Sequence, residues 1–225
     1  LRTFFREGRY DEAVSVLNRL EAQSPEALAR DKNPYRATAL AARGMVEARR
    51  ESVAVRHSRG VDRVLREEAL DVMGRSRRSY DVLFGGGPDH VVLLDIFPTA
   101  SRFIGASGLP PEAVRKTGVV ALSKWSRLLI SSPRALSRGY GWKDTIAHEY
   151  IHLVVAFRSE DRAPVWLQEG LAKLLESRWR EDQNTALTVH QQSLLAAAVA
   201  NDGLVPFKKF KHSMAYLDSG DEAAL

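Results

Sequence analysis

The spacing of apolar residues near the start of the chain predicts helices. Apolar side chains recur there at intervals of three and four residues, the spacing of one helix face, at Ala13, Leu17 and Leu20. A second stretch, over residues 35–50, is rich in Ala, Glu and Arg, and favours a helix. We therefore expect residues 1–50 to form an all-helical segment.

The middle of the chain has the pattern of a small sheet with one long helix packed against it. Residues 61–80 have an amphipathic helical period, whose apolar face consists of Val61, Val64, Leu65, Ala69, Val72 and Met73. Three glycines and a proline at residues 85–88 predict a turn, and residues 98–108 predict a short helix. Strands are expected over residues 52–56, 90–96, 117–122 and 127–131.

The last third of the chain returns to a helical period. Asp144 is a suitable N-cap for a helix whose apolar residues point to nearly all sides, which predicts that this helix is buried. A polar turn follows over residues 158–164, and further helices are expected over 165–180 and 193–201.

The composition and charge of the chain limit the classes of protein to which it can belong. Hydrophobic residues make up 44% and charged residues 27%, which is typical of a globular protein of one large or two small domains. No apolar run reaches the roughly 18 residues of a membrane span. The 33 Lys and Arg exceed the 28 Asp and Glu but are spread along the chain, so we expect an Arg-rich surface and no nucleic-acid partner. Without cysteine, any metal site must use His, Asp or Glu, and the compartment stays undecided.

The segment His-Glu-Tyr-Ile-His at residues 148–152 is the candidate for chemistry. His148 and His152 are four residues apart, so a helix brings both imidazoles onto one face, where they can reach one zinc ion. Glu149 is turned by about 100° around the helix axis and can reach a water bound to that ion. Burial of these three polar residues on an otherwise apolar helix would be costly without a partner such as a metal.

A catalytic zinc site needs a third protein ligand and an open position. The downstream candidates are Glu160, Asp161, Glu169 and Glu176. An antiparallel helical hairpin with its turn near Asp161 places Glu169 opposite His152, whereas Glu176 is two turns too far along. Gly170 is expected to let the two helices approach each other.

These motifs resemble the gluzincin metallopeptidases, and in particular the peptidase MA-like domain. The resemblance rests on the His-Glu-Tyr-Ile-His segment and, sixteen residues later, on Glu169 within Trp-Leu-Gln-Glu-Gly-Leu-Ala. It implies that His148, His152 and Glu169 bind one Zn²⁺ and that Glu149 is the catalytic base. It also implies an α+β, thermolysin-like zincin domain over residues 51–225, with residues 127–131 as the edge strand that pairs with substrate.

The N-terminal helical segment resembles a tetratricopeptide repeat. The residues that carry this resemblance are Gly8, Tyr10, Ala13, Leu17, Leu20 and Pro25. Only one partial repeat is visible, and such repeats need neighbours to bury their faces. We therefore expect a piece of a longer protein, with a tetratricopeptide-like segment over 1–50 that offers a surface for a protein partner and a peptidase domain truncated at its C-terminal end.

The sequence departs from the gluzincin pattern at two points. Many relatives carry an acidic residue one turn after the glutamate ligand, where this chain has Lys173, so that Asp144 becomes a candidate to support His148. No motif identifies the oxyanion donor, for which the available residues are Tyr140, His190, His212 and Tyr216. We expect a zinc metallopeptidase acting on a peptide or protein, and the alternative is an inactive, metallopeptidase-like binding or scaffold module.

Overall fold

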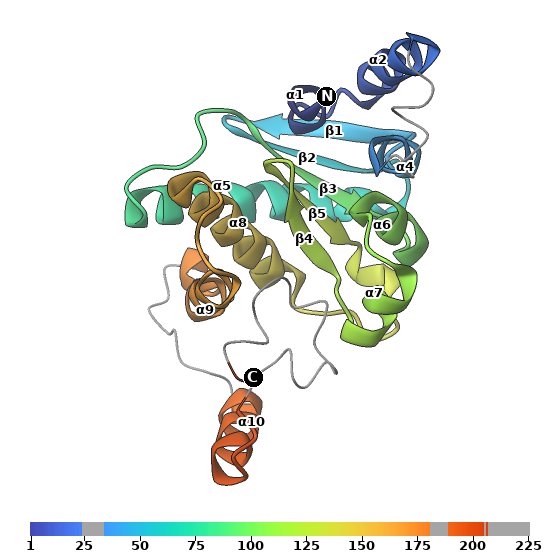
Figure 1. Cartoon of the computed structure of the whole chain (residues 1–225). Helices are drawn as coiled ribbons and strands as arrows, with labels where there is room; N and C mark the ends of the chain where they lie inside the picture. The colour runs from blue at the N-terminus through green and yellow to red at the C-terminus, as the bar shows by residue number, and fades with distance from the viewer. Residues whose placement is uncertain (24–33, 181–188, 205, 207–225) are drawn as a thin grey trace.

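The protein is an α+β protein built around one mixed sheet of five strands (Figure 1). The computed structural model describes residues 1–23, 34–180, 189–204 and 206. The strands are β1 (Met45–Arg50), β2 (Val53–Ser58), β3 (Val92–Phe97), β4 (Ala121–Lys124) and β5 (Arg127–Ser131). They lie in the order β1-β2-β3-β5-β4, with β2, β3 and β5 parallel and the two edge strands antiparallel to their neighbours.

Helices cover both faces of the sheet. One face packs against α5 (Arg66–Leu83), α8 (Trp142–Ser159), α9 (Val165–Leu175) and the short 3-10 turn η3 (Arg178–Arg180). The other face packs against α1 (Arg2–Arg6), α2 (Tyr10–Gln23), α4 (Pro34–Ala41), α6 (Ala100–Ser107) and α7 (Pro111–Thr117). The remaining described elements are the 3-10 turns η1 (Val61–Leu65) and η2 (Pro133–Ala135) and the helix α10 (Val189–Ala200).

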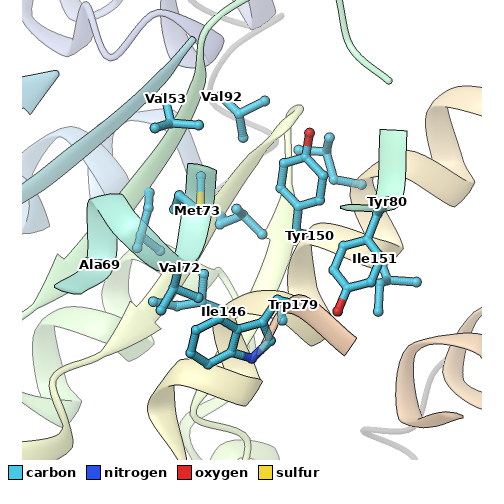
Figure 2. Packing of buried hydrophobic residues seen from close by; sticks show 14 of the residues in the cluster. Val53, Ala69, Val72, Met73, Tyr80, Val92, Ile146, Tyr150, Ile151 and Trp179 are labelled. Atoms are coloured by element: carbon cyan, nitrogen blue, oxygen red, sulfur yellow. The ribbon is translucent and has the colours of Figure 1, made fainter. Parts of the chain in front are cut away.

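The strands supply both hydrophobic cores because successive side chains point to opposite faces of a sheet. In β3, Leu94 and Ile96 belong to the core beneath α5 and α8, whereas Phe97 belongs to the core beneath α6. Figure 2 shows the first of these cores, in which residues of α5 meet Ile146, Tyr150 and Ile151 of α8. Strands buried on both faces read as apolar runs, which is the pattern of β3 apart from the buried Asp95.

Buried and half-buried hydrogen bonds fix α8 and α9 relative to α5. The Tyr80 hydroxyl donates to the Leu175 carbonyl oxygen at 2.7 Å, and the Tyr150 hydroxyl donates to Asp81 Oδ1 at 2.8 Å. Trp179 Nε1 donates to Asp144 Oδ1 at 2.9 Å, which joins η3 to the first turn of α8. Two helices of the candidate site are therefore held by specific polar contacts as well as by apolar packing.

The expected helix over residues 35–50 is wrong in its second half. The helix α4 ends at Ala41, and residues 45–50 form β1, which pairs with β2 from Met45↔Ser58 to Arg50↔Val53. Gly44 turns the chain between them with φ +77°, a conformation that favours glycine. Pairing with β2 overrides the helix propensity of these residues. The expected domain boundary at residue 50 therefore lies within a β hairpin.

Other elements follow the sequence more closely. The strands expected over 52–56, 90–96 and 127–131 are present as β2, β3 and β5, and the helix expected over 61–80 is present as η1 followed by α5. The strand expected over 117–122 begins only at Ala121, and the helix expected over 165–180 ends at Leu175. Asp144 is not the N-cap of α8, because Gly141 has that position and Asp144 lies within the first turn. Among the described residues, no helix is both long and apolar enough to cross a membrane.

Candidate metal centre

Two consecutive helices bring the two histidines and Glu169 together. His148 and His152 lie one turn apart on α8, and Glu169 lies on α9, which packs against α8. His148 Nε2 and His152 Nε2 are 3.1 Å apart. Glu169 Oε2 lies 3.5 Å from His148 Nε2 and 3.4 Å from His152 Nε2. The three residues expected as ligands thus converge on one point.

The triangle formed by these atoms has the size that a tetrahedral zinc ion requires. Zinc ligands at about 2.0–2.1 Å from the ion lie roughly 3.3–3.4 Å from one another at the corners of a tetrahedron. The observed separations of 3.1, 3.4 and 3.5 Å span one face of such a tetrahedron. In the part of the chain that the structure describes, this is the only group of three or more potential ligands found close enough together to share an ion.

Charge also favours a cation at this point. Burial alone would lower the pKa of His148, but the carboxylates of Glu169 and Glu176 outweigh burial and raise that pKa to about 10. Burial would likewise raise the pKa of Glu169, but hydrogen bonds from the two histidines lower it to about 2. The site therefore holds positive charge between its carboxylates, a role that a metal ion can take over when both imidazoles are neutral.

Glu149 lies in a buried environment that affects the protonation of its carboxyl group. Its residue is only 7% exposed, and burial raises the pKa of its carboxyl group. The backbone N–H of Ser123 in β4 donates to this carboxylate. Its Oε2 atom is buried and has no hydrogen-bond partner among the described residues. A buried carboxylate oxygen without a partner is costly, and such groups are concentrated at functional sites.

The second ring nitrogen of His148 has a partner that sequence reasoning missed. Glu176 Oε2 lies 3.1 Å from His148 Nδ1, and Lys173 Nζ lies 2.6 Å from Glu176 Oε1. Glu176 was expected to be too far along to bind the ion, and it is not one of the three clustered ligands. A signal was present in the sequence, because His148 lies one turn further from the hairpin turn than His152. In an antiparallel pair of helices, residues about one to two turns after Glu169 then lie near His148.

Two expected supporting interactions are wrong. Asp144 does not support His148, because its two oxygens accept hydrogen bonds from Trp179 Nε1 and Arg180 Nη2. Gly170 does not permit the approach of α8 and α9, because a Cβ atom placed there would meet no described atom within 4 Å. Ala172, two residues further along α9, is fully buried and belongs to the core that α9 shares with α5 and α8.

The expected edge strand is also wrong. Residues 127–131 form β5, which lies between β3 and β4 and pairs with both. The edge strand on this side of the sheet is β4, which packs against α8 and supplies the Ser123 N–H to Glu149. The sequence identified both strands but could not order them, because their order depends on long-range pairing.

A cavity of about 520 Å³ runs along β4, and none of His148, Glu149, His152 and Glu169 lines it. Its walls include Ser123 and Lys124 of β4 and, from the second half of α8, Leu153 and Phe157. Ser123 is the residue that connects this cavity with Glu149, because it lines the cavity and its backbone contacts that carboxylate.

The candidate oxyanion donors are only partly covered by the structure. Tyr140 is described, and its hydroxyl donates to the Ser131 carbonyl oxygen, while burial and the nearby Glu149 carboxylate raise its pKa. His212 and Tyr216 lie outside the described residues, as does the side chain of His190.

Comparisons of the chain with protein-family models, with curated proteins and with solved structures found no match.

Proposed function

We propose that this protein is a zinc-dependent metallopeptidase of the gluzincin type, with a thermolysin-like arrangement of edge strand, active-site helix and ligand helix. The observation that carries the proposal is the triangle of His148 Nε2, His152 Nε2 and Glu169 Oε2, which has the dimensions of one tetrahedral face. The fourth corner of that tetrahedron is left for water or substrate, as catalytic zinc sites require.

A zinc ion held by these three residues would lower the pKa of a water molecule towards about 7 and polarise a substrate carbonyl. Glu149 accepts the proton of the attacking water, because its carboxylate lies one residue from His148 and has an oxygen without a partner among the described residues. The same carboxyl group then passes the proton to the leaving amine. Its burial raises its pKa, which brings it closer to the range in which one group can both take and give a proton.

The strand β4 is the part of the chain best suited to hold an extended peptide. It pairs with β5 on one side only, and of its outer backbone groups the Ser123 N–H already contacts Glu149, which leaves the others for a further strand. A peptide paired with β4 would pass Glu149, since Ser123 in this strand contacts that carboxylate. The cavity lined by Ser123 and Lys124 would then receive side chains of the substrate.

A second candidate function is a metallopeptidase-like binding module without catalysis. Among the expected oxyanion donors, Tyr140 is the one whose side chain the structure describes. Its hydroxyl donates to the Ser131 carbonyl oxygen instead of pointing to an oxyanion, which favours a module without catalysis. Glu149 argues against this alternative, because a module that only binds has no need for a buried carboxylate beside the ligand pair.

The proposal is tested by the Glu149→Gln variant. The change keeps the shape of the side chain but removes its ability to accept a proton. We expect the zinc-loaded wild type to hydrolyse members of a fluorogenic peptide library, and the variant to hold the same amount of zinc but lose turnover. Equal peptidase activity in the two proteins would remove Glu149 from the mechanism. A wild type that holds zinc and cleaves no peptide in the library would favour the binding module.

A further inference from the structure

We propose that Glu176 is a positioning residue that holds the His148 ring in the orientation and tautomer needed to bind the metal, and that Lys173 holds Glu176 in place. The inference rests on the proposed zinc site and goes beyond its ligands. It assigns a role to the lysine that occupies the position where an acidic residue was expected.

The contacts of the His148 ring carry this inference. Its Nε2 atom faces His152 and Glu169, at 3.1 and 3.5 Å, whereas its Nδ1 atom faces Glu176 Oε2 at 3.1 Å. A neutral imidazole has one N–H and one free nitrogen lone pair. A carboxylate acceptor at Nδ1 places the proton there, so that the lone pair of Nε2 points towards the other two ligands.

Glu176 cannot be a fourth ligand in this arrangement. The two nitrogens of an imidazole ring point in different directions, so an oxygen that contacts Nδ1 is on the side of the ring away from the shared point. The clustered ligand atoms accordingly belong to His148, His152 and Glu169, without Glu176. The open coordination position therefore stays free for water or substrate.

Lys173 completes the arrangement from the same helix. Lys173 and Glu176 are three residues apart at the end of α9, and Lys173 Nζ lies 2.6 Å from Glu176 Oε1. The lysine occupies one carboxylate oxygen and leaves the other for His148. Its positive charge also offsets the negative charge of Glu176. Three carboxylates, those of Glu149, Glu169 and Glu176, surround the two imidazoles, and the lysine reduces their combined negative charge. An acidic residue at position 173 would repel Glu176, which explains why lysine fits this chain.

The inference is tested by zinc affinity, measured in competition with a chromogenic zinc chelator. Carboxylates that orient a ligand histidine contribute roughly 10–100-fold in metal affinity. We expect Glu176→Ala to raise the Kd for zinc by roughly that factor. Glu176→Gln keeps an oxygen acceptor and should raise the Kd less than Glu176→Ala, and Lys173→Met should also have a smaller effect. Circular dichroism of each metal-free variant checks that the fold is retained.

Asp144→Ala is the matched control. Asp144 lies one turn before His148 on the same helix, and it contacts Trp179 and Arg180 but not the histidine. We expect this variant to lose stability while its Kd for zinc stays within about twofold of wild type. Equal losses of affinity in Asp144→Ala and Glu176→Ala would assign the effect to loosened packing of the segment after α9 and would overturn the inference.

The outcomes separate this inference from the proposed function. If the wild type binds zinc and Glu176→Ala binds it equally well, the positioning role is wrong while the zinc site stands. If the wild type does not bind zinc, both are wrong. If Glu176→Ala fails to fold, the Kd values for zinc of the wild type, Glu176→Gln and Lys173→Met test the inference instead. Higher Kd values in the two variants support it, and three equal Kd values overturn it.

Discussion

At the scale of single residues, Glu169 is the proposed ligand that joins the two helices of the site. It is the only one of the three that comes from α9, and its Oε2 atom lies 3.4–3.5 Å from both histidine Nε2 atoms. The histidine pair follows from local geometry, because residues four apart on any helix share a face. The position of Glu169 depends in addition on how the hairpin closes.

We predict that Glu169→Gln weakens zinc binding more than any change in the residues that support the ligands. The amide keeps the size of the side chain but loses the negative charge that a hard carboxylate ligand supplies. The loss should exceed the roughly 10–100-fold typical of an outer partner, and elemental analysis after dialysis measures it. Glu160→Gln is the control, since that side chain is 78% exposed in the turn before α9. Equal zinc content in the two variants would contradict the assignment.

At the scale of elements, the site depends on the close packing of α9 against α8. Ala172 lies one turn after Glu169 and is fully buried in the core that α9 shares with α8 and α5, so there is no room for a larger side chain at this position. Sequence reasoning predicted the hairpin and the opposition of Glu169 and His152, because both depend on a short turn and a helical period. It misplaced the contact at Gly170, since no pattern in the sequence reports how a helix is rotated about its axis.

We predict that Ala172→Leu lowers the free energy of unfolding by about 1–3 kcal/mol, the usual cost of overpacking a core. The added atoms should push α9 away from α8 and move Glu169 out of the ligand triangle, so zinc affinity should fall as well. Leu174→Ala is the control on the same helix, because Leu174 is 54% exposed and its loss should cost no more than about 0.5 kcal/mol. Urea unfolding and zinc titration of both variants measure the two effects. Unchanged zinc affinity in Ala172→Leu would show that the site does not depend on this packing.

The strands show where sequence reasoning about elements ends. Three of the four expected strands are present where they were expected, since buried strands read as apolar runs. The strand β1 was missed because its sequence, Met-Val-Glu-Ala-Arg-Arg, favours a helix and becomes a strand only through pairing with β2. The sequence also predicted β5 as the edge strand, whereas the edge strand is β4. The cause is the same, because the order of strands depends on tertiary pairing.

At the scale of the whole molecule, a buried ion pair joins the N-terminal helices to the sheet. Arg127 of β5 and Asp95 of β3 form a salt bridge in which neither side chain is exposed, and the Tyr10 hydroxyl of α2 contacts both. The Arg127 guanidinium also lies 4.9–5.5 Å from the ring centroids of Tyr10, Phe5 and Trp125. The helices expected to form a separate segment are thus packed on the same sheet as the candidate metal centre, on its opposite face.

We predict that Arg127→Met lowers the free energy of unfolding by about 3–5 kcal/mol, because it leaves the Asp95 carboxylate buried without its partner. Adding Asp95→Asn should recover part of this loss, since the uncompensated charge is then removed. Chemical denaturation of the two single variants and the double variant measures the coupling between the residues. Additive losses would show that the pair contributes no specific interaction.

The central claim is that His148, His152 and Glu169 hold one zinc ion. The most direct test is a crystal structure of the zinc-loaded protein with anomalous diffraction recorded on both sides of the zinc absorption edge. We predict one anomalous peak at about 2.0–2.2 Å from His148 Nε2, His152 Nε2 and a Glu169 oxygen, with Glu149 beside it and not bound to it. An anomalous map with no peak among these atoms, or with the zinc held by other residues, would contradict the account.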